Sequence, residues 1–365
     1  MKKMDYLFRK MVDWIFKYKS YGLIIFKSGI WITGISLLGG FVLNFSYEGT
    51  EQSFSLLAQS SDSGLALIQQ IGFFLGLFLV IVGIIWLALN ELGEYRIHSK
   101  RKVVVIEQRG LKDTSDSPLA NALPKTLKGF RDKLLCDIRK YIQKGFVIGP
   151  EEALNEVVHL ERDIQAKVAG FDKSDLTLVY GGLMPVPYTF LTGMIFDDEI
   201  RLVAYDWDRT QEVWRALDDE DDGERFQCTL ANLGEQKEAV LCISASYQVD
   251  LENVNKVFSG MPISHMQLET ISSDCHWSIE KQSALASQFL ECVKGISSKG
   301  VQTIHLIIAA PNSLVLRLGR AYDSRNLCKV IVYQYEKSNE PAYPWGVQMP
   351  THGITHPFIT AACSE

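Results

Sequence analysis

The segment Ile307–Gly319, IIAAPNSLVLRLG, holds residue types that could bind an anion. An apolar run stops at Pro311, two hydrogen-bonding residues follow, and a helical pattern then carries Arg317. A proline here starts a helix, and the free backbone N–H groups of a helix N-terminus attract phosphate. Helical side chains lean toward the N-terminus, so Arg317 could reach back to this loop. The alternative is structural: Pro311 and Ser313 merely begin a helix, and Arg317 pairs with an acid.

The rest of the sequence offers no catalytic constellation. It contains no G-x-S-x-G, no H-E-x-x-H and no P-loop lysine motif. His352 and His356 are four residues apart, but an intervening glycine and two flanking prolines argue against a helix that would hold a metal. Three further titratable residues are better explained by structural roles: His265, Asp274 and His276. We therefore predict that the protein is not an enzyme and binds no metal and no cofactor.

The anion-binding pattern occurs twice, because VYGGLMPVPYTFLTGMIFD (Val179–Asp197) aligns with HLIIAAPNSLVLRLGRAYD (His305–Asp323). The aligned positions share a proline, a glycine and an aspartate: Pro185 with Pro311, Gly193 with Gly319, and Asp197 with Asp323. After a two-residue insertion the match continues in this order: VAYDWDR (Val203–Arg209) with IVYQYEK (Ile331–Lys337), then Trp214 with Trp345. Order and spacing indicate a duplication, with two lobes related by a pseudo-twofold axis.

Both copies belong to a region in which short apolar strands alternate with helices, as in an α/β fold with parallel strands. Ligands of such sheets bind at the carboxyl ends of the strands, where the loops Gly181–Pro187 and Ala310–Ser313 would lie. Two such loops that face each other would hold a ligand with more than one phosphate. Helices are also predicted at Arg131–Lys144, Pro150–Val168 and Ser278–Ser297.

Two long uncharged segments precede this region, Ser28–Tyr47 and Ser63–Asn90, the second centred on Ile71–Leu89. Each is long enough to span a bilayer, which needs about 20 residues. Lys and Arg precede the first segment and follow the second, whereas the charges within residues 48–70 are all acidic. Because basic residues stay on the cytoplasmic side, we expect two membrane passes with both termini in the cytoplasm.

The membrane hairpin leaves two questions open. Gly72, Gly76 and Gly83 lie on nearly one helical face and could pack against the other span or against another chain. Lys27 could extend to the lipid headgroups or line an anion-favouring pore formed by several chains. Two spans cannot enclose an aqueous path alone, so a channel would require a homo-oligomer. The first 20 residues, MKKMDYLFRKMVDWIFKYKS, form a basic amphipathic pattern suited to the inner leaflet.

The overall composition limits the partners and the compartment. The 365 residues are 47% hydrophobic and 22% charged, and the net charge of −6 gives no reason to expect a nucleic-acid polymer as partner. Seven widely spaced cysteines without a C-x-x-C pair fit a reducing compartment. The acidic run DDEDDGE (Asp218–Glu224) is typical of a solvated loop.

Across residues 150–350 the chain resembles the SAVED domain family, in which two fused CARF-like (Rossmann-like) lobes sense cyclic oligonucleotides in bacterial CBASS antiphage defence. The resemblance rests on these pieces in this order: LVYGGLMPVPYTFLTG, VAYDWDR, LCISASYQV, ISH, IHLIIAAPNSLVLRLG and VIVYQYE. The N-terminal hairpin resembles the subgroup in which SAVED is fused to a membrane effector. The predicted fold class is therefore α/β, with two transmembrane helices followed by a cytoplasmic SAVED domain of two lobes.

The predicted domain boundaries follow this division. We expect a basic amphipathic segment at 1–21, a transmembrane helical hairpin at 22–91, a connector at 92–149, the SAVED domain at 150–350 and a tail at 351–365. Within the SAVED domain, the first lobe is expected at about 175–232 and the second at about 237–345.

The resemblance implies a second-messenger receptor in the bacterial inner membrane. Its ligand would be a cyclic di- or trinucleotide made by a partner nucleotidyltransferase. Binding would promote homo-oligomerisation, and the gathered hairpins would open a pore or ion channel in the bilayer, or disrupt it. The alternative is a membrane-anchored nucleotide-processing enzyme, because CARF-like lobes sometimes cleave their own ligand.

The resemblance also places the ligand pocket between the lobes, and the residues that line it are our own prediction. The first lobe is expected to contribute three residues: Met184, Pro185 and Tyr188. The second lobe is expected to contribute four: Pro311, Asn312, Ser313 and Arg317. Strand alternation puts Ser244 and Ser246 on one face, where they could meet a base or a phosphate. Trp207 and Tyr335 end equivalent strands and could stack on bases or pack in the core.

Overall fold

The structure, a computed structural model, describes residues 21–38, 41–48, 51–58, 63–196, 198–337 and 339–361. The chain divides into two compact units, residues 1–97 and 98–365, and each is described by itself. The amphipathic segment predicted for the first 20 residues lies outside the described residues.

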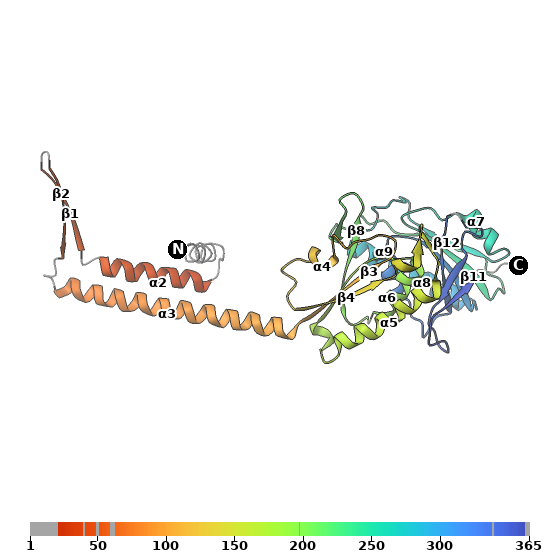
Figure 1. Ribbon diagram of the computed structural model, residues 1–365, viewed down its shortest axis with the longest axis horizontal. Helices are drawn as coiled ribbons and strands as arrows, with labels where there is room; N and C mark the ends of the chain where they lie inside the picture. Colours follow the sequence, from red (N-terminus) through yellow and green to blue (C-terminus); the bar gives the residue numbers. More distant parts are fainter. Residues whose placement is uncertain are drawn as a thin grey trace. The chain divides into compact units, whose positions relative to one another are not determined.

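The described residues of the first unit form two helices and a β-hairpin (Figure 1). Helix α2 (Tyr21–Leu38) lies beside α3 (Ser63–Lys100), and strands β1 (Phe41–Glu48) and β2 (Glu51–Ala58) pair antiparallel between them in sequence. In the described part of the chain, one helical stretch is long and apolar enough to cross a membrane: Leu67–Gly93, with a mean hydropathy of 2.8. The helix predicted at Ser63–Asn90 is confirmed.

The position of the first predicted span is wrong. The helix begins at Tyr21 and ends at Leu38, and Phe41–Glu48 of the expected span Ser28–Tyr47 form strand β1 instead. The sequence explains the early end, because Gly39 and Gly40 are poor helix formers and every second residue that follows them is aromatic or aliphatic. The apolar stretch of α2 is therefore shorter than that of α3.

The small residues of α3 pack against α2 within the same chain. A Cβ atom on Gly76 would overlap Thr33, and one on Gly83 would come within 2.7 Å of the backbone nitrogen of Phe26. Gly72 faces Ser36 of α2 in the same way. Of the two alternatives for this face, the structure thus shows packing within the chain, where small residues let two helices approach closely.

The second unit contains two sheets of the same design. The first sheet has the order β4-β3-β7-β8-β9: Phe130–Asp137, Lys102–Arg109, Leu176–Leu183, Arg201–Asp208 and Val213–Ala216. The second has the order β10-β12-β11-β13-β14-β15-β16: Gln227–Thr229, Ile263–Gln267, Glu238–Ser244, Thr303–Ala309, Lys329–Gln334, Trp345–Gln348 and Phe358–Ala361.

The strand pairing extends the duplication beyond the aligned segments. In the first sheet β4, β3, β7 and β8 are parallel and β9 is antiparallel. In the second sheet β12, β11, β13 and β14 are parallel and β15 is antiparallel. Both sheets therefore follow the same Rossmann-like order, in which the second strand of the lobe lies beside the first and the third lies on the other side. The α/β class with two Rossmann-like lobes is confirmed.

The first lobe begins earlier in the chain than residue 175. Strands β3 and β4 lie within residues 92–149, so this segment builds the first sheet and is not only a connector. The helix predicted at Arg131–Lys144 is wrong, since its first half is strand β4, whose backbone pairs in parallel with the buried strand β3. Pairing with β3 overrides the local helical pattern. Strand β10 belongs to the second sheet although it precedes residue 232, and β16 lies in the expected tail.

The helices cover the faces of the two sheets. The predictions for the two long helices are confirmed by α5 (Pro150–Val168) and α8 (Ile279–Ser298), the latter capped by the Ser278 hydroxyl. The remaining helices are α4 (Leu119–Ala122), α6 (Val186–Ile195), α7 (Leu251–Val257) and α9 (Asn312–Ala321). The described part of the second unit also contains short 3-10 turns and a small ladder: η1 (Arg139–Tyr141), β5 (Ile142–Gln143), β6 (Phe146–Val147) and η2 (Lys173–Asp175).

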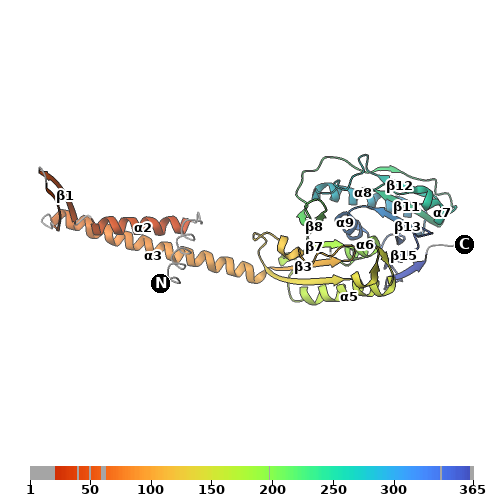
Figure 2. The same ribbon diagram turned by 45° about the horizontal axis from the view of Figure 1, so that its top comes forward.

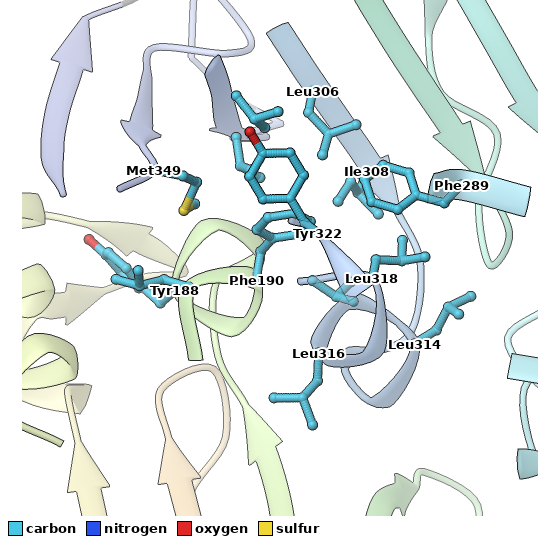
Figure 3. Close-up of a cluster of buried hydrophobic side chains, with 14 of the residues drawn as sticks. Tyr188, Phe190, Phe289, Leu306, Ile308, Leu314, Leu316, Leu318, Tyr322 and Met349 are labelled. Atoms are coloured by element: carbon cyan, nitrogen blue, oxygen red, sulfur yellow. The ribbon is translucent and has the colours of Figure 1, made fainter. Parts of the chain in front are cut away.

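Helices α6 and α9 pack against each other between the two sheets (Figure 2). Their contact is reciprocal, because a Cβ on Gly193 would overlap the carbonyl oxygen of Leu316, and one on Gly319 would overlap that of Phe190. The repeat alignment pairs the two glycines with each other and Phe190 with Leu316. The core around this crossing is filled by aromatic and leucine side chains from both lobes (Figure 3). The helix pair thus lies on the pseudo-twofold axis and fixes where each helix N-terminus points.

Candidate ligand pocket between the two lobes

A cavity of about 650 Å³ lies between the lobes at the carboxyl ends of their strands. The loops that follow β11 and β13 contribute Ser246–Asp250 and Ala309–Asn312. The first lobe contributes Leu111 after β3 and Leu183 and Val186 around the end of β7. In each lobe these loops follow the first and third strands, between which the strand order reverses, and this is where α/β sheets bind ligands.

Each of the two helix N-termini at this cavity is capped by the opposite lobe. The backbone N–H of Ser313 in α9 donates to Asp206 Oδ2 in β8 at 3.0 Å. The backbone N–H of Val186 in α6 donates to Gln334 Oε1 in β14 at 3.2 Å. Asp206 and Gln334 occupy the same position in the aligned segments, so the two caps are related by the pseudo-twofold axis. Each such cap contributes about 1 kcal/mol and ties the lobes together.

A third contact between the lobes is present only in one direction. The side-chain amide of Asn312 donates to the carbonyl oxygen of Gly182 at 2.9 Å. Its counterpart in the first lobe is Val186, which has no side-chain donor. The α9 end of the cavity is therefore bound more firmly to the first lobe than the α6 end is to the second.

The structure places five of the predicted ligand-binding residues around the cavity: Trp207, Ser246, Pro311, Asn312 and Tyr335. Tyr335 is the most open of these aromatic residues, with 45% of its surface exposed. Trp207 is mostly buried against Trp214, with the ring centroids 5.2 Å apart, so core packing accounts for much of its ring.

The other six predicted residues do not line the cavity. Met184, Tyr188, Ser244 and Ser313 are buried, and Pro185 is the N-cap of α6. The Tyr188 hydroxyl donates to the Pro150 carbonyl oxygen, and burial raises the pKa of this phenol far above its usual value. The Ser244 hydroxyl is 2.8 Å from His265 Nε2 and also accepts from a backbone N–H. Ser244 is the last residue of β11 and is hydrogen-bonded within the second lobe, whereas Ser246 lies beyond the end of the strand, at the cavity.

Arg317 does not reach back to the loop before its helix. Its Nε donates to Gln282 Oε1 at 3.3 Å and its Nη1 to Ser283 Oγ at 3.2 Å, both in α8. Burial, with a smaller effect from Arg320, lowers the pKa of its guanidinium from the usual high value. The expectation that it faces the ligand edge is wrong, since α8 packs beside α9 and offers nearer partners.

Two cations at the cavity were missed, Arg209 and Lys337. They end the aligned segments VAYDWDR and IVYQYEK, so the repeat itself contained the signal. Arg209 Nη1 donates to the hydroxyl of Tyr247 at 3.0 Å, which holds its guanidinium near the second lobe. One positive charge therefore stands at the end of the equivalent strand in each lobe.

A buried histidine lies beside one of the two caps. His276 lines the cavity, is 4% exposed, and neither ring nitrogen has a hydrogen-bond partner among the described residues. Its Nε2 lies 3.4 Å from Asp206 Oδ2, and its ring stacks on Trp277 at 4.3 Å. Burial lowers the pKa of His276, and the Asp206 carboxylate opposes this effect.

The acidic run Asp218–Glu224 borders a separate open hollow of about 570 Å³. The buried ammonium of Lys281 pairs with Asp222 at 2.6 Å and with Glu224 at 2.8 Å. Arg225 pairs with Asp221 at 2.6 Å. The loop is thus held to α8 by ion pairs and is not simply solvated, and the described residues contain no group of acids, cysteines and histidines that could hold a metal.

Comparisons with known proteins agree with this architecture. Residues 160–349 match the model of the SAVED family, described as the "SMODS-associated and fused to various effectors sensor domain". Residues 1–154 match the "SAVED-fused 2TM effector domain". No curated protein matches the sequence.

Solved Cap4 SAVED/CARF-domain containing receptors are similar to the chain. The Acinetobacter baumannii receptor with the cyclic trinucleotide 2′3′3′-cAAA aligns at 13% identity and a TM-score of 0.47, over 78% of this chain and 59% of that one. The Moraxella osloensis receptor aligns at 14% identity and a TM-score of 0.44, over 79% of this chain and 59% of that one. The chain thus spans well under two thirds of the length of these receptors. Since the SAVED model covers more than half of the sequence, the protein belongs to the SAVED family, with its sensor domain fused to a two-span membrane effector module.

Proposed function

We propose that the protein is a CBASS membrane effector whose pocket between the lobes binds a cyclic di- or trinucleotide, which a partner nucleotidyltransferase supplies. The observation that carries this proposal is the cavity of about 650 Å³ at the carboxyl ends of both sheets, where two helix N-termini and two cations converge. Backbone N–H groups, a guanidinium and an ammonium are suited to phosphodiesters. The exposed ring of Tyr335 is suited to stacking on a base.

The ligand signal would pass to the membrane module through strand β3. Helix α3 ends at Lys100 and β3 begins at Lys102, so one residue separates them in sequence. The same strand ends at Arg109, two residues before Leu111 of the pocket. A shift of β3 on ligand binding would therefore act on the end of α3.

Binding would drive homo-oligomerisation and open a pore or ion channel in the bacterial inner membrane, or disrupt it, with both termini in the cytoplasm. Two spans cannot enclose an aqueous path, so the conducting form needs several chains. Lys27 lies within α2, a helix of 18 residues, and is the candidate for a charged ring in such a pore. The glycine face of α3 is occupied by α2, so other faces of the hairpin would form the contacts between chains.

The oligomerisation step can be tested on the full chain purified in detergent. A panel of cyclic di- and trinucleotides that includes 2′3′3′-cAAA and 3′3′3′-cAAA is added, and the sedimentation coefficient and the leakage of a small dye from vesicles are measured. We expect one member to increase both. If the whole panel leaves sedimentation and leakage unchanged, the proposal is wrong.

One observation favours the alternative function, a membrane-anchored nucleotide-processing enzyme. His276 and Asp206 form a histidine–carboxylate pair that lines the cavity, an arrangement that could move a proton. Incubation of the protein with the bound cyclic nucleotide, followed by chromatography, separates the two functions. We expect the ligand to be recovered intact, and linear products that disappear in His276→Gln would favour the enzyme.

A further inference from the structure

The two halves of the pocket are built alike but differ in charge. Asp206 caps α9 with a carboxylate, whereas Gln334 caps α6 with a neutral amide. The two side chains come from equivalent positions of equivalent strands, and both line the cavity. The pseudo-twofold axis thus relates two anion-attracting helix ends, of which one already holds an anion from the protein itself.

The α9 half is closed to a second anion while Asp206 remains in place. Asp206 is 5% exposed, and its other carboxylate oxygen accepts from the backbone N–H of Trp207 at 2.8 Å. Two backbone N–H groups therefore hold this carboxylate, and a bond between an N–H and a charged oxygen is strong. A phosphate brought to the same helix end would face this carboxylate in a poorly hydrated place, where repulsion between like charges is large.

The cap of the α6 half carries no charge. Gln334 accepts from Val186 N–H through an uncharged oxygen, and its own amide donates to the neighbouring carbonyl oxygen of Tyr335. An incoming phosphate can replace this neutral acceptor and gain a stronger bond with Val186 N–H. Lys337, three residues further along, adds a positive charge on this side.

The α9 half instead offers groups that suit an uncharged partner. His276 is 4% exposed and lines the cavity, yet neither ring nitrogen has a hydrogen-bond partner among the described residues. A neutral imidazole has one donor and one acceptor nitrogen, and the adjacent carboxylate accepts hydrogen bonds. The exocyclic amine of a base or a ribose hydroxyl is the kind of group that such a site binds.

We propose that Asp206 and Gln334 determine the orientation of the ligand: a phosphate binds at the N-terminus of α6, and an uncharged base edge or ribose hydroxyl binds at Asp206 and His276. The proposal rests on the proposed function, because it takes the pocket to be the nucleotide site. It makes the pocket selective for ligands that present different groups to the two lobes.

The test uses inorganic tripolyphosphate as a probe and the full chain in detergent, with affinity measured by isothermal titration calorimetry. Gln334→Glu should weaken binding by about tenfold, since it places a carboxylate in the α6 half. Asp206→Asn should strengthen binding by about threefold or more, since it removes the carboxylate from the α9 half. Asp274→Asn makes the same change of charge at another carboxylate of the cavity and should have a smaller effect than either.

A second pair of variants keeps the test valid if the variants of the buried caps misfold. It changes Arg209 and Lys337, which are exposed at the cavity and can be replaced without disturbing the core. Lys337→Met should weaken tripolyphosphate binding more than Arg209→Met. The proposal would be overturned if the Lys337 and Arg209 variants lost equal affinity for tripolyphosphate, or if the Asp206, Gln334 and Asp274 variants changed that affinity equally. It would also be overturned if the unaltered protein did not bind tripolyphosphate. A cyclic nucleotide that binds while Gln334→Glu has no effect would refute the orientation alone. The tripolyphosphate pattern without any nucleotide binding would refute the proposed function alone.

Discussion

The two lobes of the sensor domain share a backbone design but differ in the side chains at their common pocket. Both have the same strand order, and each contributes one helix to a crossing that is stabilised by reciprocal glycine contacts. At the pocket, Asp206 of the first lobe corresponds to Gln334 of the second, and Val186 corresponds to Asn312. The helix crossing is symmetric because each helix needs a glycine at the contact, whereas the side chains that line the cavity differ between the lobes.

Substitutions that disrupt the symmetric crossing of α6 and α9 should have the largest effect on stability. Gly193→Val and Gly319→Val each force a side chain into a backbone carbonyl of the opposite helix, which no rotamer can relieve. We expect each to lower the free energy of unfolding by more than about 4 kcal/mol. The measurement is denaturant unfolding of the full chain, followed through the spectroscopic signal of the sensor domain.

Gly295→Ala is the matched control, because a Cβ atom at this helical position in α8 meets no atom within 4 Å. It should leave stability unchanged or raise it by up to about 1 kcal/mol. If Gly193→Val and Gly319→Val differ by more than about 2 kcal/mol, the two halves of the crossing are not equivalent and the comparison fails.

The next effect separates the two caps. Asp206→Ala should cost about 2 kcal/mol, because it removes a charged acceptor from two buried N–H groups. Gln334→Ala should cost about 1 kcal/mol, because it removes a neutral acceptor from one. Thermal unfolding of both variants under the same conditions gives the difference, and equal losses would show that the charge of the cap has no part in holding the lobes together.

A change of pH should affect the second lobe more than the first. His265, His276 and His305 all belong to the second lobe, and burial lowers the pKa of each below its ordinary value. Below pH 6.5 these histidines bind protons in the unfolded chain but not in the folded lobe, so the free energy of unfolding falls as the pH decreases. Above pH 7 these groups no longer change the stability. We expect the melting temperature to fall by roughly 3 °C between pH 7.5 and pH 5.5.

Hydrogen exchange at the two pH values locates this effect. Amides of β11 and β13 should lose more protection at pH 5.5 than amides of β3 and β7. His305 bonds Tyr333 at 2.9 Å and Glu238 at 3.2 Å in the core of the second lobe, so His305→Gln should reduce the pH dependence. Equal loss of protection in both lobes would contradict the assignment.

The smallest expected effect concerns Arg317, which only the second lobe possesses. Because its guanidinium donates to Gln282 and Ser283 of α8, Arg317→Ala should cost about 1 kcal/mol of stability. Affinity for a cyclic nucleotide, measured by equilibrium dialysis, should change by less than about threefold, since the side chain lies outside the cavity. A loss of tenfold or more would return Arg317 to the site.

The sequence predicts the duplicated lobes because strand, proline and helix recur with constant spacing around Pro185 and Pro311. It does not reveal that β3 and β4 begin the first lobe. These strands correspond to β11 and β12 in the way they pair with their neighbours, but their residue types do not match. The β1–β2 hairpin was missed for a related reason, because an apolar run predicts a helix or a strand equally well until its partner is known.

The sequence predicts a pocket at the carboxyl ends of the strands, where the structure has a cavity, but several of the predicted side chains lie outside that cavity. Pro311 and Asn312 were found because a loop after a buried strand must lie at that edge. The caps could not be found in this way, since Asp206 reaches a helix more than 100 residues away in the chain. Arg317 was misassigned because its contact with α8 depends on how three elements pack, which spacing along one helix does not contain.

The most direct test of the central claim is the binding of a labelled cyclic oligonucleotide to the full chain, measured by equilibrium dialysis with the double variant Arg209→Glu/Lys337→Glu beside the unaltered protein. Both cations line the pocket, so we predict that the double variant loses at least about a hundredfold in affinity. Lys294→Glu, an exposed change on α8 away from the pocket, should bind as the unaltered protein does. Equal affinity of the double variant and the unaltered protein would contradict the claim that the ligand binds between the lobes.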